Sequence, residues 1–361
     1  MTAAAAPLAG LVFAVDDTIE VGAPALRRLL DAGALFLGER ELAGPGSAVA
    51  VASGIADFAV ATGATVPTGL RGIVGLKPTP GLVPVTGIVP PTRPYDRMTV
   101  FAPTLELGQR ALAVMTGPDP RDPRSRPWPP SVRLAAPDRP KIAIPDDSEL
   151  APLATEAKYA FHAAVGRLRG FDATVECVEV TPFLETARLF TAAPAAGEVS
   201  AHRFVAELER LDRARMSFAA SLKRFDALLL PTSDTGFVNL FDLAAVGVPA
   251  GRKDENPLTV SIVTRGFEDQ VAIDIAARLT GEQAATPYPT GIDLVADPGL
   301  RAELTHLGAR SAGLCEGSTP LRASPPPPSS ESRAGERWTI SAAGLGQLAA
   351  TRPGRGWRLY S

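Results

Sequence analysis

The chain has 361 residues, of which 45% are hydrophobic and 21% charged, and its formal net charge is −3. This balance excludes a strongly basic protein of the kind that binds nucleic acid or an anionic membrane surface. The length and apolar content predict a large buried core, arranged as one large domain or two.

The cysteines and histidines form no pattern typical of a disulfide framework or a zinc site. Only two cysteines and three histidines are present, and they lie far apart: Cys177, Cys315, His162, His202 and His306. We therefore expect neither a metal nor an organic cofactor. The apolar N-terminal stretch "MTAAAAPLAGLVFAVDD" lacks a basic segment and is too short to span a bilayer. This predicts a cytoplasmic protein with no membrane partner.

The first third of the chain alternates between strand and helix patterns. A short apolar run predicts a buried strand over 11–15, followed by a helix that ends near Gly33 and another strand. "SAVAVASGIADFAVATG" predicts a helix over 47–53 and a strand around 58–61. "GIVGLKPTPGLVPVTGIVPPT" is rich in proline, which favours an irregular packed region over a sheet. "TLELGQRALAVMTG" predicts a helix.

The second part repeats the alternation after a polar, proline-rich connection over 119–140. "KIAIP", "ATVECVEV", "DALLLPT" and "PLTVSIVTRG" predict strands. An amphipathic helix lies between the first two, and a helical pattern runs from "FLETARLFTAA" to "RMSFAASLKRF". "VNLFDLAAVGVPAG" predicts a helix and then a turn, and "FEDQVAIDIAARLTG" a closing helix. Alternating helices and strands predict an α/β layer architecture.

The order of several strings resembles the amidase signature family, and within it the allophanate hydrolases. The strings include "PLAGLVFAV", "GSAVAVASGIADFAV", "GIVGLKPTPGLVPVTGIVP" and "FEDQVAIDIAARLTG", and they span roughly residues 7–281. The resemblance implies an α/β fold with a mixed central sheet layered by helices. It also implies a shortened amidase-signature-like domain over 1–281. Residues 282–361 are then a Pro/Ser-rich linker plus a reduced α+β appendage, the remnant of the C-terminal domain of those enzymes.

The resemblance also implies a chemistry, amide hydrolysis by a Ser–Ser–Lys triad with a Gly-rich oxyanion loop. Aligned on "FAV", the lysine position is occupied by Asp16. Aligned on "GSAVAVA", the relay serine position is Ala43, which has no hydroxyl. Ser47 matches the last serine of that loop, which is neither nucleophile nor relay. We expect Ser47 to cap a helix that begins at Ala48.

The loop that carries the nucleophile in this family has no full counterpart. Between Phe58 and Pro67 the chain is too short to hold it, and Thr62 and Thr65 are the nearest hydroxyls. The substrate-binding tyrosine and arginine of allophanate hydrolases are also missing between "LLLPT" and "NLFDL". Other matching positions are expected to be structural: Lys77, Arg93 and Asp96.

Three functions remain open. The first is a pseudoenzyme without the triad, a binding scaffold for a small amide or carboxylate ligand or a partner protein, or a decaying gene product. The second is an active enzyme with a rebuilt site, which requires two or more candidate side chains to converge in one pocket. Its candidates are Asp16, Ser47, Thr62, Thr65 and Asp96. The third is an ordinary allophanate hydrolase or amidase. A homodimer is a further expectation, because the family often dimerises.

Overall fold

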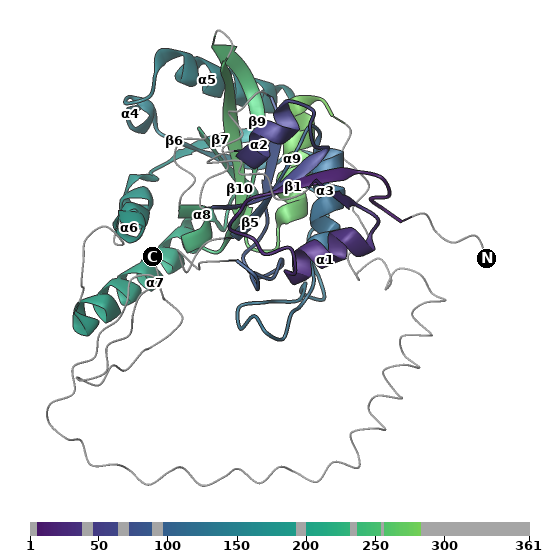
Figure 1. Cartoon of the computed structure of the whole chain (residues 1–361). Helices are drawn as coiled ribbons and strands as arrows, with labels where there is room; N and C mark the ends of the chain where they lie inside the picture. Colours follow the sequence, from purple (N-terminus) through teal and green to yellow (C-terminus); the bar gives the residue numbers. More distant parts are fainter. Residues whose placement is uncertain are drawn as a thin grey trace, which may run out of the picture.

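The computed structural model describes residues 6–37, 46–63, 72–88, 97–192, 200–231, 237–253 and 256–282. A ten-stranded sheet runs through them in the order β2-β1-β3-β5-β4-β9-β10-β8-β6-β7 (Figure 1). Its strands are β1 (Val12–Val15), β2 (Leu35–Phe36), β3 (Phe58–Gly63), β4 (Val74–Lys77), β5 (Arg97–Ala102), β6 (Lys141–Pro145), β7 (Thr174–Val178), β8 (Ala227–Pro231), β9 (Leu243–Lys253) and β10 (Asn256–Arg265).

The sheet is mixed, as the resemblance implied. The pairings at its two ends are parallel: β1 with β2 and β3, and β6 with β7 and β8. The five pairings that lead from β3 through β5, β4, β9 and β10 to β8 are antiparallel. The expected α/β fold is therefore confirmed.

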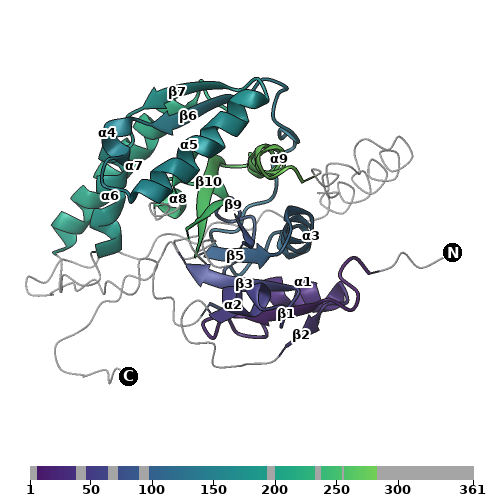
Figure 2. The same ribbon diagram turned by 90° about the horizontal axis from the view of Figure 1, so that it is seen from above.

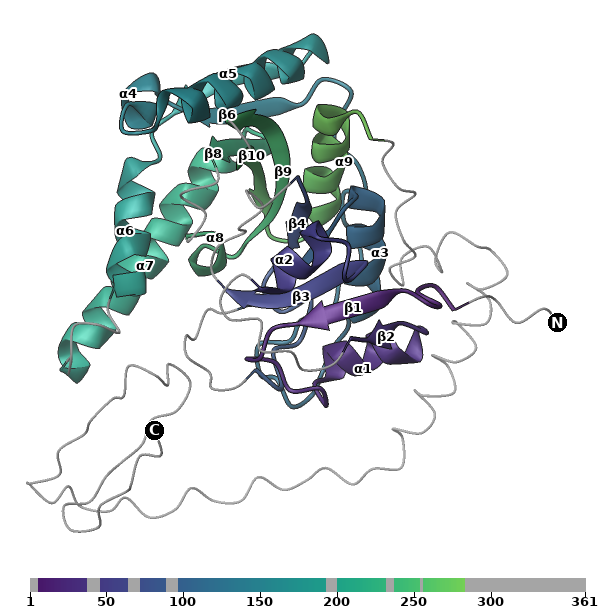
Figure 3. The ribbon, with the colours of Figure 1, turned by 45° about the horizontal axis from the view of Figure 1, so that its top comes forward.

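Helices cover both faces of the sheet, as Figures 2 and 3 show. Those described are α1 (Pro24–Asp31), α2 (Gly46–Ala52), α3 (Leu105–Met115), α4 (Asp147–Leu150), α5 (Thr155–Gly170), α6 (Thr181–Ala192), α7 (Ala201–Leu222), α8 (Phe237–Leu240) and α9 (Asp269–Thr280). The main core lies between the sheet and α1, α3, α5 and α9. On the other face, α2 covers one end of the sheet and α6, α7 and α8 cover the other.

Side chains alternate between these two cores along each strand, as the pleat of a strand requires. In β1, Phe13 and Val15 enter the main core, and Ala14 enters the small core under α2. In β6, Ile142 enters the core that includes α5, and Ala143 enters the core that includes α7. Helices α5 and α7 therefore lie on opposite faces of β6.

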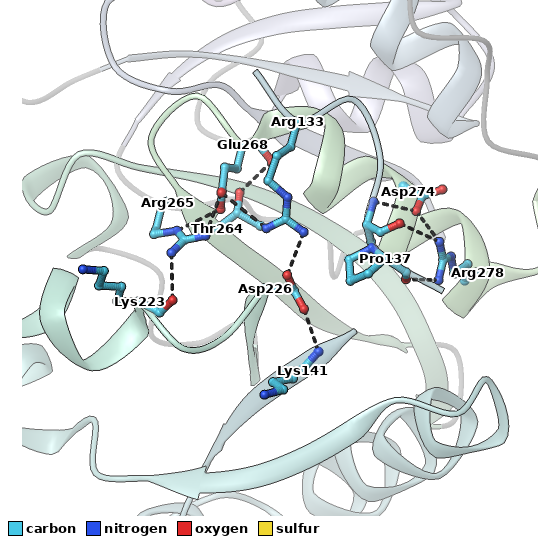
Figure 4. Close-up of polar contacts among 11 residues, drawn as sticks. Arg133, Pro137, Lys141, Lys223, Asp226, Thr264, Arg265, Glu268, Asp274 and Arg278 are labelled. Atoms are coloured by element: carbon cyan, nitrogen blue, oxygen red, sulfur yellow. Dashed lines mark hydrogen bonds and ion pairs between the residues drawn. The ribbon is translucent and has the colours of Figure 1, made fainter. Parts of the chain in front are cut away.

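The proline-rich connection between α3 and β6 is fixed by charged side chains (Figure 4). Arg133 Nη2 lies 2.7 Å from Asp226 Oδ1, and the backbone N–H of Lys141 donates to Asp226 Oδ2 at 2.8 Å. Arg278, in α9, donates to the carbonyl of Pro137 at 2.8 Å. Because Asp226 precedes β8 and Lys141 begins β6, the Asp226 carboxylate ties the starts of these two parallel strands to the connection.

Two expectations about the centre of the sheet are wrong. Part of the stretch expected to be irregular, Val74–Lys77, is the fully buried strand β4. The turn expected in "AAVGVPAG" is instead part of β9, which pairs along its whole length with β10. The register shifts between Leu258, which pairs with Gly251, and Thr259, which pairs with Pro249, so this β-bulge leaves Ala250 outside the regular ladder.

Residues 283–361 lie outside the described part, so the expected linker and C-terminal appendage stay predictions. Among the described helices, none has an apolar stretch of the length that a bilayer crossing needs.

Candidate active site

Three of the candidate residues meet where β1 and β3 end beside the first turn of α2. Strands β1 and β3 are parallel, so their carboxyl ends share one edge of the sheet. Asp16 directly follows β1, Thr62 is the penultimate residue of β3, and Ser47 is the second residue of α2. Residues far apart in sequence are thus brought to one place.

Small side chains let α2 approach the sheet closely at this edge. Ala48 and Ala50 of α2 pack in one buried cluster with Ala14 of β1 and with Ala59 and Ala61 of β3. Because these five side chains are methyl groups, the first turn of α2 lies close against the end of β1. This packing places the Ser47 side chain beside Asp16.

The carboxyl of Asp16 is half-buried and bound by two neighbours. The backbone N–H of Thr62 donates to Asp16 Oδ2 at 3.2 Å, and the side chain of Ser47 also hydrogen-bonds to the carboxyl. Burial raises the pKa of Asp16 above its usual value, and the nearby charge of Asp17 adds to this rise. The hydrogen bonds from Ser47 and Thr62 oppose it. Asp16 is therefore a carboxyl held in a partly dry site.

Ser47 does not cap a helix that begins at Ala48, so that expectation is wrong. Helix α2 begins at Gly46, and Ser47 lies inside its first turn with only 1% of its surface exposed. The Asp16 carboxyl offers the hydroxyl an acceptor on the neighbouring strand. A hydroxyl buried in this way is shielded from any substrate in solution.

The hydroxyl of Thr62 is engaged elsewhere. Its Oγ1 lies 2.7 Å from Oγ1 of Thr18, and both residues are partly exposed. Thr62 pairs with Met98 in the sheet, and Met98 belongs to the main core, on the face opposite α2. Strand alternation therefore places the Thr62 side chain away from the α2 face, and only its backbone N–H reaches the Asp16 carboxyl.

The other candidates, Ala43, Thr65 and Asp96, lie outside the described residues, as does Arg93. The structure thus brings together Asp16 and Ser47 by their side chains and Thr62 by its backbone. Across the described ranges, no group of three or more His, Cys, Asp or Glu residues is arranged to hold a metal ion.

Among the cations near this edge of the sheet, Lys77 has the pKa that is shifted most, and its surroundings fit the structural role expected for it. It ends β4 with its side chain fully buried, and its ammonium donates to the backbone carbonyl of Leu243. The pKa of Lys77 is lowered to about 7, mainly by burial and in part by the nearby Arg97, while Asp269 opposes the shift. Because the ammonium is buried against a carbonyl, it is not open to a substrate. The proline-rich sequence around Lys77 concealed this burial.

The family model for amidases matches residues 44–220 of the chain. A search of curated protein sequences finds no match. Among solved structures, a serine-to-alanine variant of Kluyveromyces lactis allophanate hydrolase aligns with a TM-score of 0.68 and 24% identity. The alignment covers 78% of this chain and 63% of that enzyme, so the chain spans less than two thirds of its length.

Two shorter relatives in structure are covered more fully. A glutamyl-tRNA(Gln) amidotransferase subunit from Thermotoga maritima aligns with a TM-score of 0.64 and 19% identity, over 78% of this chain and 86% of that one. Peptide amidase from Stenotrophomonas maltophilia aligns with a TM-score of 0.63 and 20% identity, over 79% of this chain and 85% of that one. The fold is therefore that of the amidase signature enzymes, and residues 44–220 match the family model for amidases.

Proposed function

We propose that the chain is a non-catalytic relative of allophanate hydrolases and amidases that binds a small amide or carboxylic acid near Asp16. The main support is the set of hydrogen-bond partners of three hydroxyl groups, those of Ser47, Thr18 and Thr62. The Asp16 carboxyl bonds to Ser47, a hydroxyl that is buried, whereas the partly exposed hydroxyls of Thr18 and Thr62 lie against each other. A hydroxyl nucleophile needs an adjacent base and an open path to the carbonyl carbon, and none of these three residues combines the two.

The same carboxyl suits binding. Burial raises the pKa of Asp16, so the carboxyl keeps its proton to a higher pH than an exposed aspartate and can then donate a hydrogen bond. The Asp16 side chain is partly exposed, but its Oδ1 is buried and has no hydrogen-bond partner within the described residues, so a ligand reaches this atom only if the chain that covers it moves aside. An amide or a carboxylic acid offers both a donor and an acceptor to such a group.

The test combines turnover with binding. The purified chain is incubated with allophanate, malonamate and simple primary amides while ammonia release is followed, and the same compounds are screened by thermal shift. We expect no ammonia above the uncatalysed rate and a raised melting temperature with at least one compound. Asp16→Leu removes the carboxyl and should abolish that shift, whereas Glu20→Gln, which changes an exposed carboxylate in the same loop, should retain it.

A second function has one observation in its favour. A carboxyl with a raised pKa is a better general acid or base near neutral pH than an ordinary aspartate. The alternative is an amidohydrolase in which Asp16 activates water or a hydroxyl. Ammonia release that survives in Glu20→Gln and disappears in Asp16→Asn would establish this alternative and overturn the non-catalytic proposal.

A further inference from the structure

A cavity of about 750 Å³ lies at the carboxyl ends of β6, β7 and β8. It is lined by the last residue of each of these strands: Pro145, Val178 and Pro231. Four strands separate β8 from β3 in the sheet, and the cavity lining includes neither Asp16, Ser47 nor Thr62. Its volume is in the range of small-molecule sites. The function proposed above does not use it.

The topology of the sheet explains why a cavity forms there. The chain passes from β6 to β7 through α5, and from β7 through α6 and α7 to β8, on the other side of β6. Helices α5 and α7 lie on opposite faces, so the two connections diverge from β6. A crevice outside the carboxyl ends of parallel strands, where connections diverge in this way, is the usual ligand site of α/β sheets. Figure 3 shows α4 and α6 on either side of this end of β6.

The N-terminus of α6 is already occupied by a carboxylate of the cavity lining, that of Glu149. Glu149 Oε1 accepts hydrogen bonds from the backbone N–H groups of Val180 at 2.9 Å and Thr181 at 2.6 Å. Its Oε2 accepts from the backbone N–H of Asp146 at 3.2 Å. The N-terminus of a helix favours negative charge, and here the chain's own carboxylate occupies that place. An anionic ligand would have to displace it.

The rest of the cavity lining favours a positively charged ligand over an anion. Asp146 and Glu179 are exposed carboxylates at the mouth, and no Lys, Arg or His is among the described residues that line the cavity. Leu153 and Leu184 are partly exposed and supply the apolar part of the lining. We propose that this cavity binds a small organic cation, a primary amine attached to an aliphatic or aromatic group. The apolar group lies on the leucines, and the ammonium lies between the carboxylates at the mouth.

The direct test is calorimetric titration of the full chain with phenethylamine, beside 2-phenylethanol and 3-phenylpropionate, which have similar apolar groups. We expect the ammonium compound to bind most tightly and the carboxylate least. In the double variant Asp146→Asn, Glu179→Gln the affinity for phenethylamine should fall by about fivefold for each charge removed. Asparagine still caps α4, so the wall stays folded. Glu185→Gln changes an exposed carboxylate of α6 outside the cavity and should leave the affinity unchanged.

Cys177 provides an independent measurement, because it lines the cavity and its thiol is exposed and free. In a Cys315→Ser variant, phenethylamine should slow the reaction of Cys177 with 4,4′-dithiodipyridine. Cys177→Trp, which places a large ring at the mouth, should abolish phenethylamine binding without affecting the fold. Equal affinity for the alcohol and the amine would overturn the proposal. Unchanged binding in Cys177→Trp, or neither heat nor thiol protection at millimolar amine, would also overturn it.

Discussion

The backbone N–H of Thr62 donates to Oδ2 of Asp16 at 3.2 Å, across the gap between the ends of β3 and β1. The bond joins two parallel strands just beyond Val15, the last residue of β1. Among the described residues around it there is no cation paired with Asp16, and burial is the largest influence on its pKa. The carboxyl therefore contributes to this edge of the sheet by hydrogen bonding, at the expense of its own hydration.

The first prediction concerns Asp16→Asn. Because burial raises the pKa of Asp16 in the folded chain, the folded state binds more protons than the unfolded state from about pH 4 up to that raised pKa. The contribution of Asp16 to the free energy of unfolding is therefore greatest at low pH and falls as the pH rises through this window. We expect Asp16→Asn to be more stable than the parent chain at pH 7, with the difference vanishing below pH 4.

Urea unfolding at several pH values measures this difference. Glu20→Gln removes an exposed carboxylate from the same loop and should follow the parent chain throughout. An Asp16→Asn variant that is less stable than the parent at pH 7 would show that the ionised carboxylate itself is stabilising.

The second prediction concerns Lys77→Met. The pKa of Lys77 is lowered to about 7 from 10.5, so between these values the unfolded state binds a proton that the folded state lacks. The free energy of unfolding should rise with pH across this window, with a slope approaching one proton, about 1.4 kcal/mol per pH unit. The variant has no amine at this position and should lose that rise.

The measurement is denaturant unfolding from pH 7 to 10 in the parent chain, in Lys77→Met and in Lys141→Met. Lys141 is an exposed lysine at the start of β6, and its variant should retain the parent slope. Parallel slopes in the parent and in Lys77→Met would mean that Lys77 stays protonated in the folded chain throughout this range.

Strands that are plain apolar runs could be predicted from sequence, including β10 near the centre of the sheet, whereas its neighbours β4 and β9 could not. Strands β1 and β3 are apolar runs bounded by turn residues, and both lie close to their expected positions. Strand β4 has four buried residues among prolines and glycines, and β9 contains Pro249. Local pattern argues against a strand in both cases, and pairing with distant partners overrides it.

The candidate site, like the sheet, could be predicted from sequence only in part. Alignment to the family placed Asp16 at the lysine position, because that inference needs only neighbouring residues. The contact between Asp16 and Ser47 depends on how closely α2 packs on alanines of two strands. That distance is a property of the folded core, so the sequence suggested a helix cap for Ser47 instead.

The third prediction concerns the fully buried Asp269 at the start of α9. Its Oδ1 accepts from the backbone N–H of Thr79 at 2.7 Å, and its Oδ2 accepts from the Thr79 hydroxyl at 2.5 Å. The same hydroxyl accepts from the backbone N–H of Phe267. Asp269→Ala leaves two buried donors without an acceptor and should lower the free energy of unfolding by about 3 kcal/mol. Asp269→Asn keeps one acceptor and should lose less.

Urea unfolding of both variants at pH 7 tests this order. Asp138→Ala alters an exposed aspartate before β6 and should stay within about 0.5 kcal/mol of the parent chain. If Asp269→Ala were no less stable than Asp138→Ala, the link between α9 and the turn after β4 would not contribute to stability.

The fourth prediction compares two glycines with similar backbones and different surroundings. Gly81 and Gly54 have φ of +90° and +74°, where any other L-residue is strained by about 1 kcal/mol or more. A Cβ at Gly81 would lie 2.3 Å from the carbonyl oxygen of Arg124, whereas at Gly54 it would meet nothing within 4 Å. Gly54→Ala should therefore cost about 1 kcal/mol, and Gly81→Ala at least about 3 kcal/mol.

Thermal and urea unfolding of the two variants measure the difference. The carbonyl of Gly81 also accepts from the backbone N–H of Arg126 at 2.8 Å, so the turn after β4 holds the connection over 119–140 against the sheet. This contact gives the string "GLKPTPG" a structural role, since its lysine is buried and its second glycine allows the chain to pass Arg124. Equal losses in Gly81→Ala and Gly54→Ala would contradict that role and would leave the string without a structural explanation.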